Sequence, residues 1–319
     1  LTLVDTLDYL KELGINAIEL MPPNEFENNE SWGYNPSFHM ALDKYYGTPD
    51  HFKAFIDSCH GRGIAVISDI VFNHAFGQSP MLKLYWDGVN NRPAANNPWF
   101  NVVCPHPPYC WGYDYNHESL ATQNFMDRVN HYWLDEFHID GFRFDFTKGF
   151  INNSNNYDNE RIQLLKRMAD TIWSVHPNSY VILEHWADNN EEKILANYGM
   201  MLWGNVTHGY QESGMGYILN SALSWGVYKN RQWNDPHLIS YMESHDEERI
   251  MYKNVTYGNS GPNHNVKNTI TALERCEALA VIMLSTPGPK MIWQFGELGY
   301  DISINDPCRI CNKPILWNY

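Results

Sequence analysis

The chain alternates between two hydrophobic patterns along most of its length. Leu3, Leu7, Leu10 and Leu13 recur at helical spacing and predict a helix over residues 2–13 that ends at Gly14. Short continuous apolar runs predict buried strands. These strands are expected at 15–20, 64–70, 139–145, 180–184, 200–205, 238–243 and 290–294. Further helices are expected at 50–60 (capped by Asp50), 122–137, 159–175, 190–197, 213–225 and 266–285.

Strands that alternate with helices and lack a polar face predict a parallel α/β sheet with helices outside it. Seven strands after an initial helix fit a (β/α)8 TIM barrel whose first strand is missing. A doubly wound open sheet is the rival, but it predicts a glycine-rich phosphate turn, and no GxGxxG occurs. Two aperiodic segments interrupt the repeat, a loop at 24–48 and a long excursion. The predicted domains are barrel at 1–74, an inserted subdomain at 75–120, and barrel at 121–319.

The amino-acid composition and net charge limit the kinds of molecule that the protein is expected to bind. The 319 residues are 44% hydrophobic and 18% charged, which is typical of a globular protein. A net charge of −15 argues against nucleic acid and anionic membranes as partners. No apolar run in these residues is long enough to span a bilayer, and none has the pattern expected of a signal peptide. Six cysteines favour free thiols or one loop disulfide, with Cys104 and Cys110 as a possible pair, over a metal site.

The most informative stretch is the predicted strand that ends at Asp145. Phe142 and Phe144 alternate with Arg143 and Asp145, so the arginine and the carboxylate point the same way. An adjacent guanidinium favours the ionised carboxylate. An ionised, oriented aspartate is the nucleophile that covalent glycosyl transfer needs. A buried Arg–Asp pair that only supports the fold is the alternative.

Polar side chains collect at the carboxyl ends of several predicted strands. Asp69, Asn73 and His74 follow one strand, Glu184 ends another, and His245 and Asp246 follow a later one. In a barrel these ends converge on one mouth. Glu184 follows an apolar run, which favours a protonated acid, so retaining glycoside chemistry is a reasonable hypothesis.

Four separated segments resemble the signature regions of glycoside hydrolase family 13, the alpha-amylase family. They are Asp69–His74 (DIVFNH), Gly141–Asp145 (GFRFD), Val181–Glu184 (VILE) and Glu243–Asp246 (ESHD). Gly112–Asn116 (GYDYN) resembles the weaker fifth region at the end of the inserted domain. The resemblance runs from about Leu3 to Glu297. It implies a (β/α)8 barrel with a small inserted domain after the third strand.

The resemblance also implies roles for individual residues. Asp145 would be the nucleophile, Glu184 the general acid/base and Asp246 the third carboxylate, which binds ring hydroxyls, while Arg143 would orient Asp145. Substrate contacts would come from Tyr34, His74, Lys148, Trp186 and His245. Many family members hold calcium between the inserted domain and the barrel. The matching positions here are Asn73, Asp114 and the carbonyl of Gly149, and no cofactor is required for the chemistry.

The expected function is retaining hydrolysis of alpha-1,4 bonds in starch, glycogen or maltooligosaccharides. A 1,4-alpha-glucan branching enzyme or another transglycosylase is the alternative, because Glu19–Phe26 and Trp32–Pro36 look closer to branching enzymes. A non-catalytic glycan-binding barrel is the alternative from another class. Localisation is expected to be secreted for a hydrolase and cytoplasmic for a branching enzyme. The family's first strand, last helix and C-terminal β-sandwich have no counterpart here, so the chain is expected to be a fragment of limited stability.

Overall fold

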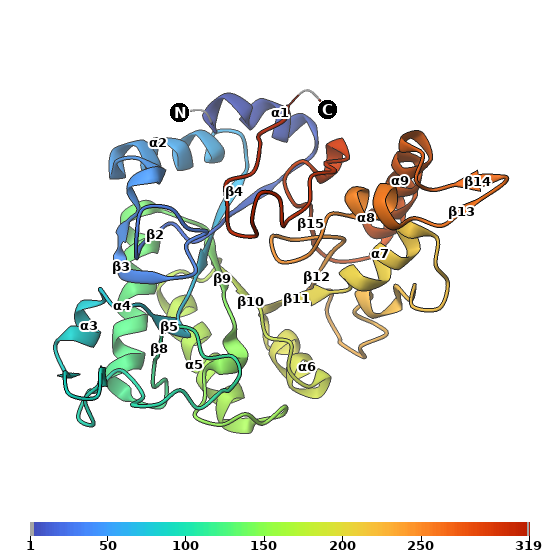
Figure 1. Ribbon diagram of the computed structural model, residues 1–319. Coiled ribbons are helices and arrows are strands. Elements are labelled where there is room, and N and C mark those ends of the chain that lie inside the picture. Colours follow the sequence, from blue (N-terminus) through green and yellow to red (C-terminus); the bar gives the residue numbers. More distant parts are fainter. Residues whose placement is uncertain (1–2, 318) are drawn as a thin grey trace. The chain divides into compact units, whose positions relative to one another are not determined.

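A computed structural model describes residues 3–317 and 319 and divides the chain into two compact units, Leu1–Met200 and Met201–Tyr319 (Figure 1). The seven predicted strands are all present within the described residues, and each lies within two or three residues of its expected bounds or inside them. The strands of each unit follow one another in chain order. A doubly wound sheet would reverse its strand order at a switch point, so this order favours a barrel.

The first unit contains four parallel strands in the order β1, β4, β9 and β10. Arg143 on β9 lies between Asp69 of β4 on one side and Ile182 of β10 on the other. Their bounds are β1 Ala17–Leu20, β4 Ala65–Ile70, β9 Gly141–Phe144 and β10 Tyr180–Leu183. All four residues of β9 are buried, as expected for a strand covered on both faces.

Helices cover this sheet, and α4 packs against both α2 and α5 (Figure 1). Thr48, not Asp50, caps α2: its hydroxyl accepts from the His51 N–H, and Pro49 takes the first helical position, where no N–H is needed. The helical bounds are η1 Val4–Thr6, α1 Leu7–Glu12, α2 Pro49–His60, α4 Leu120–Phe137, α5 Asn159–Val175 and α6 Asn189–Tyr198.

The two segments expected to be aperiodic contain short antiparallel pairs. The predicted loop at 24–48 holds the hairpin of β2 Asn24–Phe26 and β3 Pro36–Leu42, followed by η2 Lys44–Tyr46. In the excursion, β5 His74–Ala75 pairs with β8 Tyr113–Asp114, and β6 Trp86–Asp87 pairs with β7 Arg92–Pro93. The remaining elements are α3 Pro80–Lys83 and η3 Thr147–Gly149. The pairing of β5 with β8 ties the two ends of the excursion together.

The second unit contains the parallel strands β11 Met201–Asn205, β12 Leu238–Tyr241 and β15 Lys290–Met291. Helices α7 Thr207–Met215, α8 Ile250–Tyr257 and α9 Thr269–Ser285 pack on one another. The smaller elements are η4 Ser224–Gly226, β13 Ser260–Gly261, β14 His264–Asn265 and η5 Gly296–Leu298. The helix expected at 213–225 is wrong, because Gly216 adopts φ of 85° and ends α7 at Met215.

The cysteines form two disulfides within the described residues, Cys104–Cys110 and Cys308–Cys311. Cys59 and Cys276 are free thiols. The expectation of at most one loop disulfide is therefore wrong, because the CxxC segment also closes on itself.

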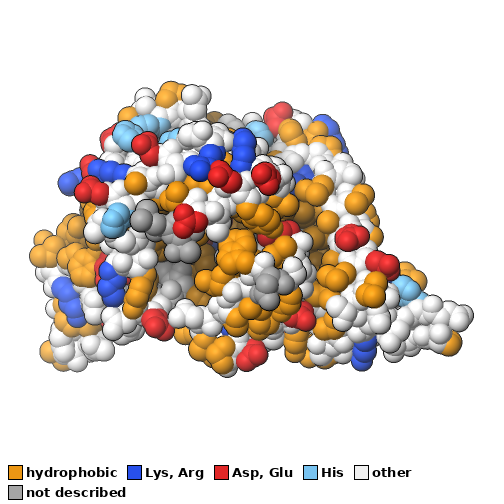
Figure 2. All heavy atoms as spheres, turned by 90° about the horizontal axis from the view of Figure 1, so that it is seen from above, with side chains coloured by type: hydrophobic (Ala, Val, Ile, Leu, Met, Phe, Trp, Pro, Cys, Tyr) orange, Lys and Arg blue, Asp and Glu red, His pale blue; other side chains and the backbone are white. Residues whose placement is uncertain are grey.

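Exposed apolar side chains lie among charged ones on the face drawn in Figure 2. The half-exposed aromatics include Tyr109 and Trp111 in the excursion. In the part of the chain that the structure describes, no helix combines the length and apolarity needed to cross a bilayer.

Two buried histidines make stability depend on pH. His39 and His117 are buried and donate from Nε2 to the carbonyls of Val71 and Phe72, at 2.9 and 2.8 Å. Burial lowers the pKa of each imidazole to about 4. The unfolded state, with a pKa near 6.5, binds more protons between about pH 6.5 and 4, so acid in this window favours unfolding.

We expect the free energy of unfolding to fall by up to roughly 3 kcal/mol for each of these histidines as pH drops from about 6.5 to 4. Urea titrations at pH 7 and 4.5 would measure the difference. His117→Gln should reduce this difference, and the same change at the exposed His51 should not. An equal pH dependence in both variants would contradict the assignment.

Candidate active site

A fully buried arginine, Arg143 on β9, holds three carboxylates together. Its Nη1 lies 2.9 Å from Asp69 Oδ1 and 3.1 Å from Asp145 Oδ1, and its Nη2 lies 2.9 Å from Glu184 Oε2. The Asp145 and Glu184 side chains are 14% and 6% exposed, so the cluster is nearly shielded from solvent. Coulombic attraction in such a site is much stronger than in water.

Strand pairing explains how the carboxylates meet. Asp69 on β4 lies directly beside Arg143 on β9. Asp145 and Glu184 each come one residue after their strand, and their N–H groups extend the ladder to the carbonyls of Ile70 and Phe144, both at 3.0 Å. The structure therefore brings Asp145, Glu184 and Arg143 together, as their sequence positions predict.

The charges in this cluster do not balance if every carboxylate is ionised. Burial raises the pKa of Asp145 well above its ordinary value, the charge of Glu184 raises it further, and Arg143 opposes both. Burial likewise raises the pKa of Asp69 to about 6, against the effect of Arg143. Sequence reasoning gave Arg143 to Asp145 alone. Because three acids share one guanidinium, the cluster favours retention of a proton.

The predicted sugar-binding residues of the first unit occupy different surroundings. Tyr34 donates its hydroxyl to Asp69, and the backbone carbonyl of Tyr34 accepts from His74 Nε2 at 2.9 Å. Tyr34 therefore borders the carboxylate cluster, and His74 is held against the backbone of Tyr34. Trp186 is 38% exposed two residues after Glu184. Lys148 donates to Asn156 at 3.0 Å. Their roles in binding substrate stay predictions.

A second buried network supports the backbone of Glu184, and sequence reasoning missed it. The Thr147 hydroxyl and N–H both bond the Glu184 carbonyl, at 3.0 and 2.9 Å. Thr147 Oγ1 also meets His185 Nδ1, and His185 Nε2 lies 2.8 Å from Glu191, which pairs with Arg161. Glu191 and Arg161 are fully buried. Little in the sequence indicates this network, since a glutamate in the first turn of a helix is usually interpreted as a surface residue that interacts with the helix dipole.

The predicted third carboxylate lies in the second unit. Asp246 Oδ2 lies 3.3 Å from His245 Nε2, and the Asp246 N–H bonds Ser244 Oγ at 3.1 Å. Arg309 Nη2 donates to the Asp246 carbonyl at 2.7 Å and lies 3.3 Å from its carboxylate. Arg309 was also missed, although it stands inside the CxxC segment. Whether Asp246 and His245 converge with Asp145 stays a prediction.

Two oxygen atoms in the first unit suit a hard cation. Asn73 Oδ1 and Asp114 Oδ1 are buried and have no hydrogen-bond partner among the described residues. Their chain segments pair, since His74 lies opposite Asp114. A Cβ on Gly149 would lie 2.0 Å from Asn73 Oδ1, so this glycine keeps the space open. Burial raises the pKa of Asp114 to about 7, as expected for a carboxylate without a counter-ion. Unpartnered oxygen donors fit calcium.

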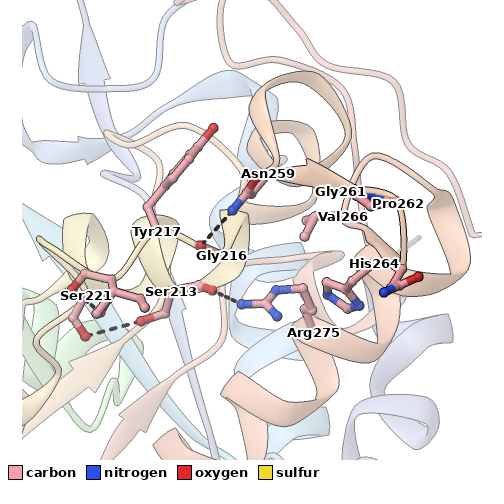
Figure 3. A pocket seen from close by; sticks show the side chains of 12 residues that line it. Ser213, Gly216, Tyr217, Ser221, Asn259, Gly261, Pro262, His264, Val266 and Arg275 are labelled. Carbon is pink, nitrogen blue, oxygen red and sulfur yellow. Dashed lines mark hydrogen bonds between the residues drawn. The ribbon is translucent and has the colours of Figure 1, made fainter.

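Other candidate sites are less informative. No group of three or more His, Cys, Asp or Glu side chains that could hold a metal occurs within residues 3–317 and 319. A cavity of about 530 Å³ in the second unit is lined by residues from α7, β13, β14 and α9 (Figure 3). Arg275 there donates to the carbonyls of Gly214 and Ser213, which stabilises the end of α7. None of the predicted site residues lines this cavity.

The fold and the buried cluster define an α/β-barrel protein with carboxylates at the carboxyl ends of its strands. Residues 2–119 match the family described as alpha amylase, catalytic domain. A malto-oligosyltrehalose trehalohydrolase from Saccharolobus solfataricus is 30% identical over 196 residues, which covers 60% of this chain and 30% of that protein. A 1,4-alpha-glucan branching enzyme, GlgB, from Geobacillus stearothermophilus is 25% identical over 92% of this chain and 46% of that protein.

A solved structure of Eubacterium rectale Amy13B is similar over 95% of this chain and 62% of that chain, with a TM-score of 0.75 and 25% identity. The chain is similar to proteins of the alpha-amylase family, glycoside hydrolase family 13, and its parallel strands and helices match part of the (β/α)8 barrel of these proteins. It spans about a third to a half of the length of these two curated relatives. The resemblance carried by its four short segments is therefore confirmed.

Proposed function

We propose that the protein is a retaining enzyme that cleaves alpha-1,4-glucosidic bonds of alpha-glucans by hydrolysis. The observation that carries this proposal is the pair Asp145 and Glu184, both within 3.1 Å of one buried guanidinium. Two carboxyl groups held this close suit the retaining mechanism, which needs a shorter separation than the inverting one.

The first step forms a covalent intermediate. Asp145 attacks C1 of the glucose at the cleavage point, and the bond from C1 to the glycosidic oxygen breaks. Glu184 gives its proton to the departing oxygen, so the leaving sugar carries a neutral hydroxyl. In the second step Glu184 takes a proton from water, which attacks C1 and releases Asp145. Two inversions restore the original configuration.

The Phe146 N–H supports the second role of Glu184, because it donates to Glu184 Oε2 at 3.0 Å. This mechanism requires Asp145 to be ionised when it attacks and Glu184 to be protonated at the same moment. Asp246 would bind ring hydroxyls of the same sugar, with His245 beside it. Tyr34 and His74 would contact that sugar from the first unit, and Lys148 and Trp186 the next ones.

Transfer to a sugar hydroxyl is the second candidate, as in a 1,4-alpha-glucan branching enzyme. It shares every step up to the covalent intermediate, and only the acceptor differs. The similarity to a protein named as a branching enzyme over 92% of this chain supports it. A hydrolase would fit a secreted protein and a branching enzyme a cytoplasmic one.

Product analysis on amylose tests the two candidates. New reducing ends with short maltooligosaccharides would support hydrolysis. Loss of iodine staining with few new reducing ends, and new alpha-1,6 links, would replace it with transfer. Intact maltoheptaose binding with no product of either kind would overturn both in favour of a non-catalytic glycan-binding barrel.

We propose calcium as a structural cofactor at Asn73, Asp114 and the Gly149 carbonyl. The unpartnered oxygens of Asn73 and Asp114 support this site. Bound there, calcium would neutralise a buried carboxylate and join the excursion to the barrel strand that precedes it. No step of the glycosyl transfer depends on it.

Calcium at a hundredfold excess over its Kd should stabilise the protein by about 2.7 kcal/mol relative to EGTA-treated protein. Thermal melts with and without 1 mM calcium would measure the change in Tm. Asp114→Asn should remove the calcium-dependent rise. Asp87→Asn in the same excursion should keep it, because Asp87 bonds Asn90 instead. An equal rise in both variants would contradict the site.

A further inference from the structure

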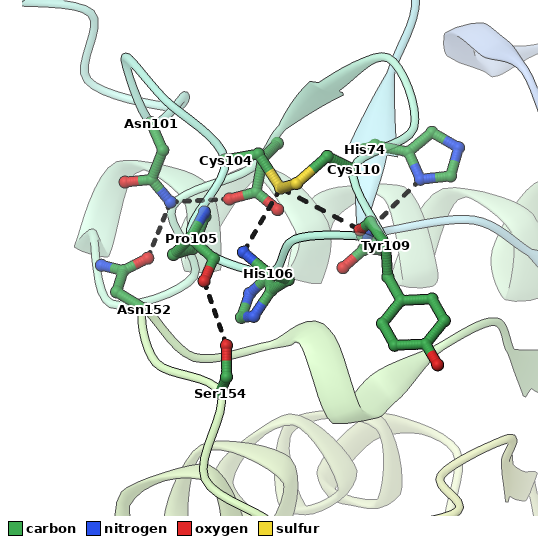
Figure 4. Close-up of a disulfide and its surroundings, with 11 residues drawn as sticks. His74, Asn101, Cys104, Pro105, His106, Tyr109, Cys110, Asn152 and Ser154 are labelled. Atoms are coloured by element: carbon green, nitrogen blue, oxygen red, sulfur yellow. Dashed lines mark hydrogen bonds between the residues drawn. A yellow bond between two sulfur atoms is a disulfide. The ribbon is translucent and has the colours of Figure 1, made fainter.

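A disulfide closes a short loop of the excursion beside the carboxylate cluster. Cys104 and Cys110 are bonded, and the His106 N–H points to Cys104 Sγ at 3.4 Å (Figure 4). Inside the loop, the Tyr109 N–H donates to the His106 carbonyl at 2.7 Å. Ser154 Oγ donates to the Pro105 carbonyl at 3.1 Å, and the buried His106 side chain interacts with the backbone of Gly149, so both tie the loop to the segment after β9. The covalent bond and these contacts together constrain the shape of this loop.

This loop presents two aromatic rings in contact with each other. The ring centroids of Tyr109 and Trp111 lie 5.9 Å apart. Tyr109 is 53% exposed and Trp111 is 45% exposed, so each keeps about half of its surface open. In Figure 4 the Tyr109 ring points away from the disulfide.

The same two rings pack against Phe146, which contacts a carboxylate of the cluster, and Trp111 also packs near His74. The Phe146 ring lies 5.7 Å from Tyr109 and 5.2 Å from Trp111, and His74 lies 6.1 Å from Trp111. Phe146 follows Asp145 directly, and its N–H donates to Glu184 Oε2. A chain of rings therefore leads from the open face of the loop to the cluster.

The backbone at Phe146 fixes the end of this chain of rings. Phe146 adopts φ of 42° and ψ of 49°, a left-handed conformation that is rare for a residue with a side chain. Such conformations persist only where the surroundings hold them. The bond from the Phe146 N–H to Glu184, and the bonds of the next residue, Thr147, to the Glu184 carbonyl, supply that support.

We propose that Tyr109 and Trp111 form a binding surface for a glucose unit of the alpha-glucan next to the cleavage point, and that the Cys104–Cys110 disulfide holds this surface in place. Flat, exposed aromatic faces bind the apolar C–H faces of a sugar ring. The charge-free rings suit a neutral glucan. This inference rests on the proposed function, since it adds a subsite to the same site.

Steady-state kinetics on two substrates test the surface. Maltoheptaose spans several sugar positions, and α-glucosyl fluoride fills only the position at the cleavage point. Trp111→Ala should lower kcat/KM for maltoheptaose about tenfold, mainly through KM, because aromatic contacts add binding that does not change in the chemical step. The value for α-glucosyl fluoride should stay within about twofold of the parent.

A matched control comes from the same excursion. Tyr85 is 39% exposed and packs on Trp99, away from Phe146, so Tyr85→Ala should leave both substrates unaffected. Trp111→Phe keeps a ring and should retain most of the activity on maltoheptaose. Melting curves identify a variant that fails to fold, and Tyr109→Ala then gives the same test at the second ring.

The role of the disulfide is tested separately. A double variant, Cys104→Ser with Cys110→Ser, should reproduce the maltoheptaose defect of Trp111→Ala. Cys276→Ser, a change at a free thiol in the second unit, controls for the loss of a cysteine elsewhere and should not. An equal defect in Cys276→Ser, or no defect in the double variant, would overturn the role of the disulfide.

The outcomes separate this inference from the proposed function. Activity of the parent on maltoheptaose, with Trp111→Ala and Tyr109→Ala both matching Tyr85→Ala, would overturn the binding surface and leave the proposed function intact. A parent that neither turns over nor binds maltoheptaose would overturn the proposed function and this inference together. A selective loss on maltoheptaose in the ring variants supports the surface.

Discussion

Asp145→Asn should lower kcat on maltoheptaose by roughly a thousandfold or more, because an amide oxygen is a poor nucleophile and no covalent intermediate can form at a useful rate. Binding should persist. The variant keeps an oxygen that can accept from Arg143, and it relieves the excess negative charge around that guanidinium. Calorimetry with maltoheptaose should therefore give a Kd within a few-fold of the parent.

The control is the same substitution at the other end of the same strand. Asp140 precedes β9 and accepts from the Val66 N–H and from His60. Asp140→Asn keeps an acceptor there and should leave kcat within about twofold of the parent. Turnover by Asp145→Asn within tenfold of the parent would remove Asp145 from the role of nucleophile.

Glu184→Gln should lower kcat on maltoheptaose by roughly 10²- to 10⁴-fold, the usual contribution of a general acid. The loss should depend on the leaving group. Fluoride leaves without needing a proton. The rate of glycosyl-enzyme formation by the variant, divided by the rate of the parent, should therefore be much larger with α-maltosyl fluoride than with maltoheptaose. Comparing both substrates in single-turnover experiments would measure this difference.

The same variant should also reveal the nucleophile. Glutamine cannot activate water, so the covalent intermediate should accumulate. Trypsin cleaves after Arg143 and Lys148, and the peptide Phe144–Lys148 should gain the mass of the transferred sugar. An equal loss on fluoride and on maltoheptaose would contradict the acid role of Glu184, and an adduct on another peptide would contradict the role of Asp145.

Much of the fold could be predicted from the sequence because buried parallel strands have a simple signature. The strands at β4, β9 and β10 are short apolar runs that end at polar residues, and their order along the chain is their order in the sheet. Helix α5 was predicted with the observed bounds, 159–175, since it has a clear polar and apolar face and begins after Asp158. The predicted carboxylates of the first unit meet because parallel strands end at one edge.

Features that depend on spacing in three dimensions could not be predicted. The hairpin of β2 and β3 is rich in Asn, Gly and Pro, and its strands show no alternation. Helix α8 has only eight residues, Ile250–Tyr257, which is too short for a periodic signal. Arg309 lies 63 residues from its partner Asp246, and nothing in the local sequence couples them. Three acids share Arg143 because β9 pairs with β4 and β10 in one particular register. The sequence of each strand alone does not reveal this register.

That sharing has a consequence for how the site reacts. In the proposed first step Asp145 loses its negative charge by becoming an ester, while Glu184 gains one by losing its proton. Both groups touch Arg143, so the sum of charge around the guanidinium is the same before and after the step. The net charge next to the buried cation is therefore unchanged by the step, although the negative charge moves from Asp145 to Glu184. The position of Arg143 between the two carboxyl groups thus keeps the local charge constant. In the second step Asp145 regains its negative charge and Glu184 regains its proton.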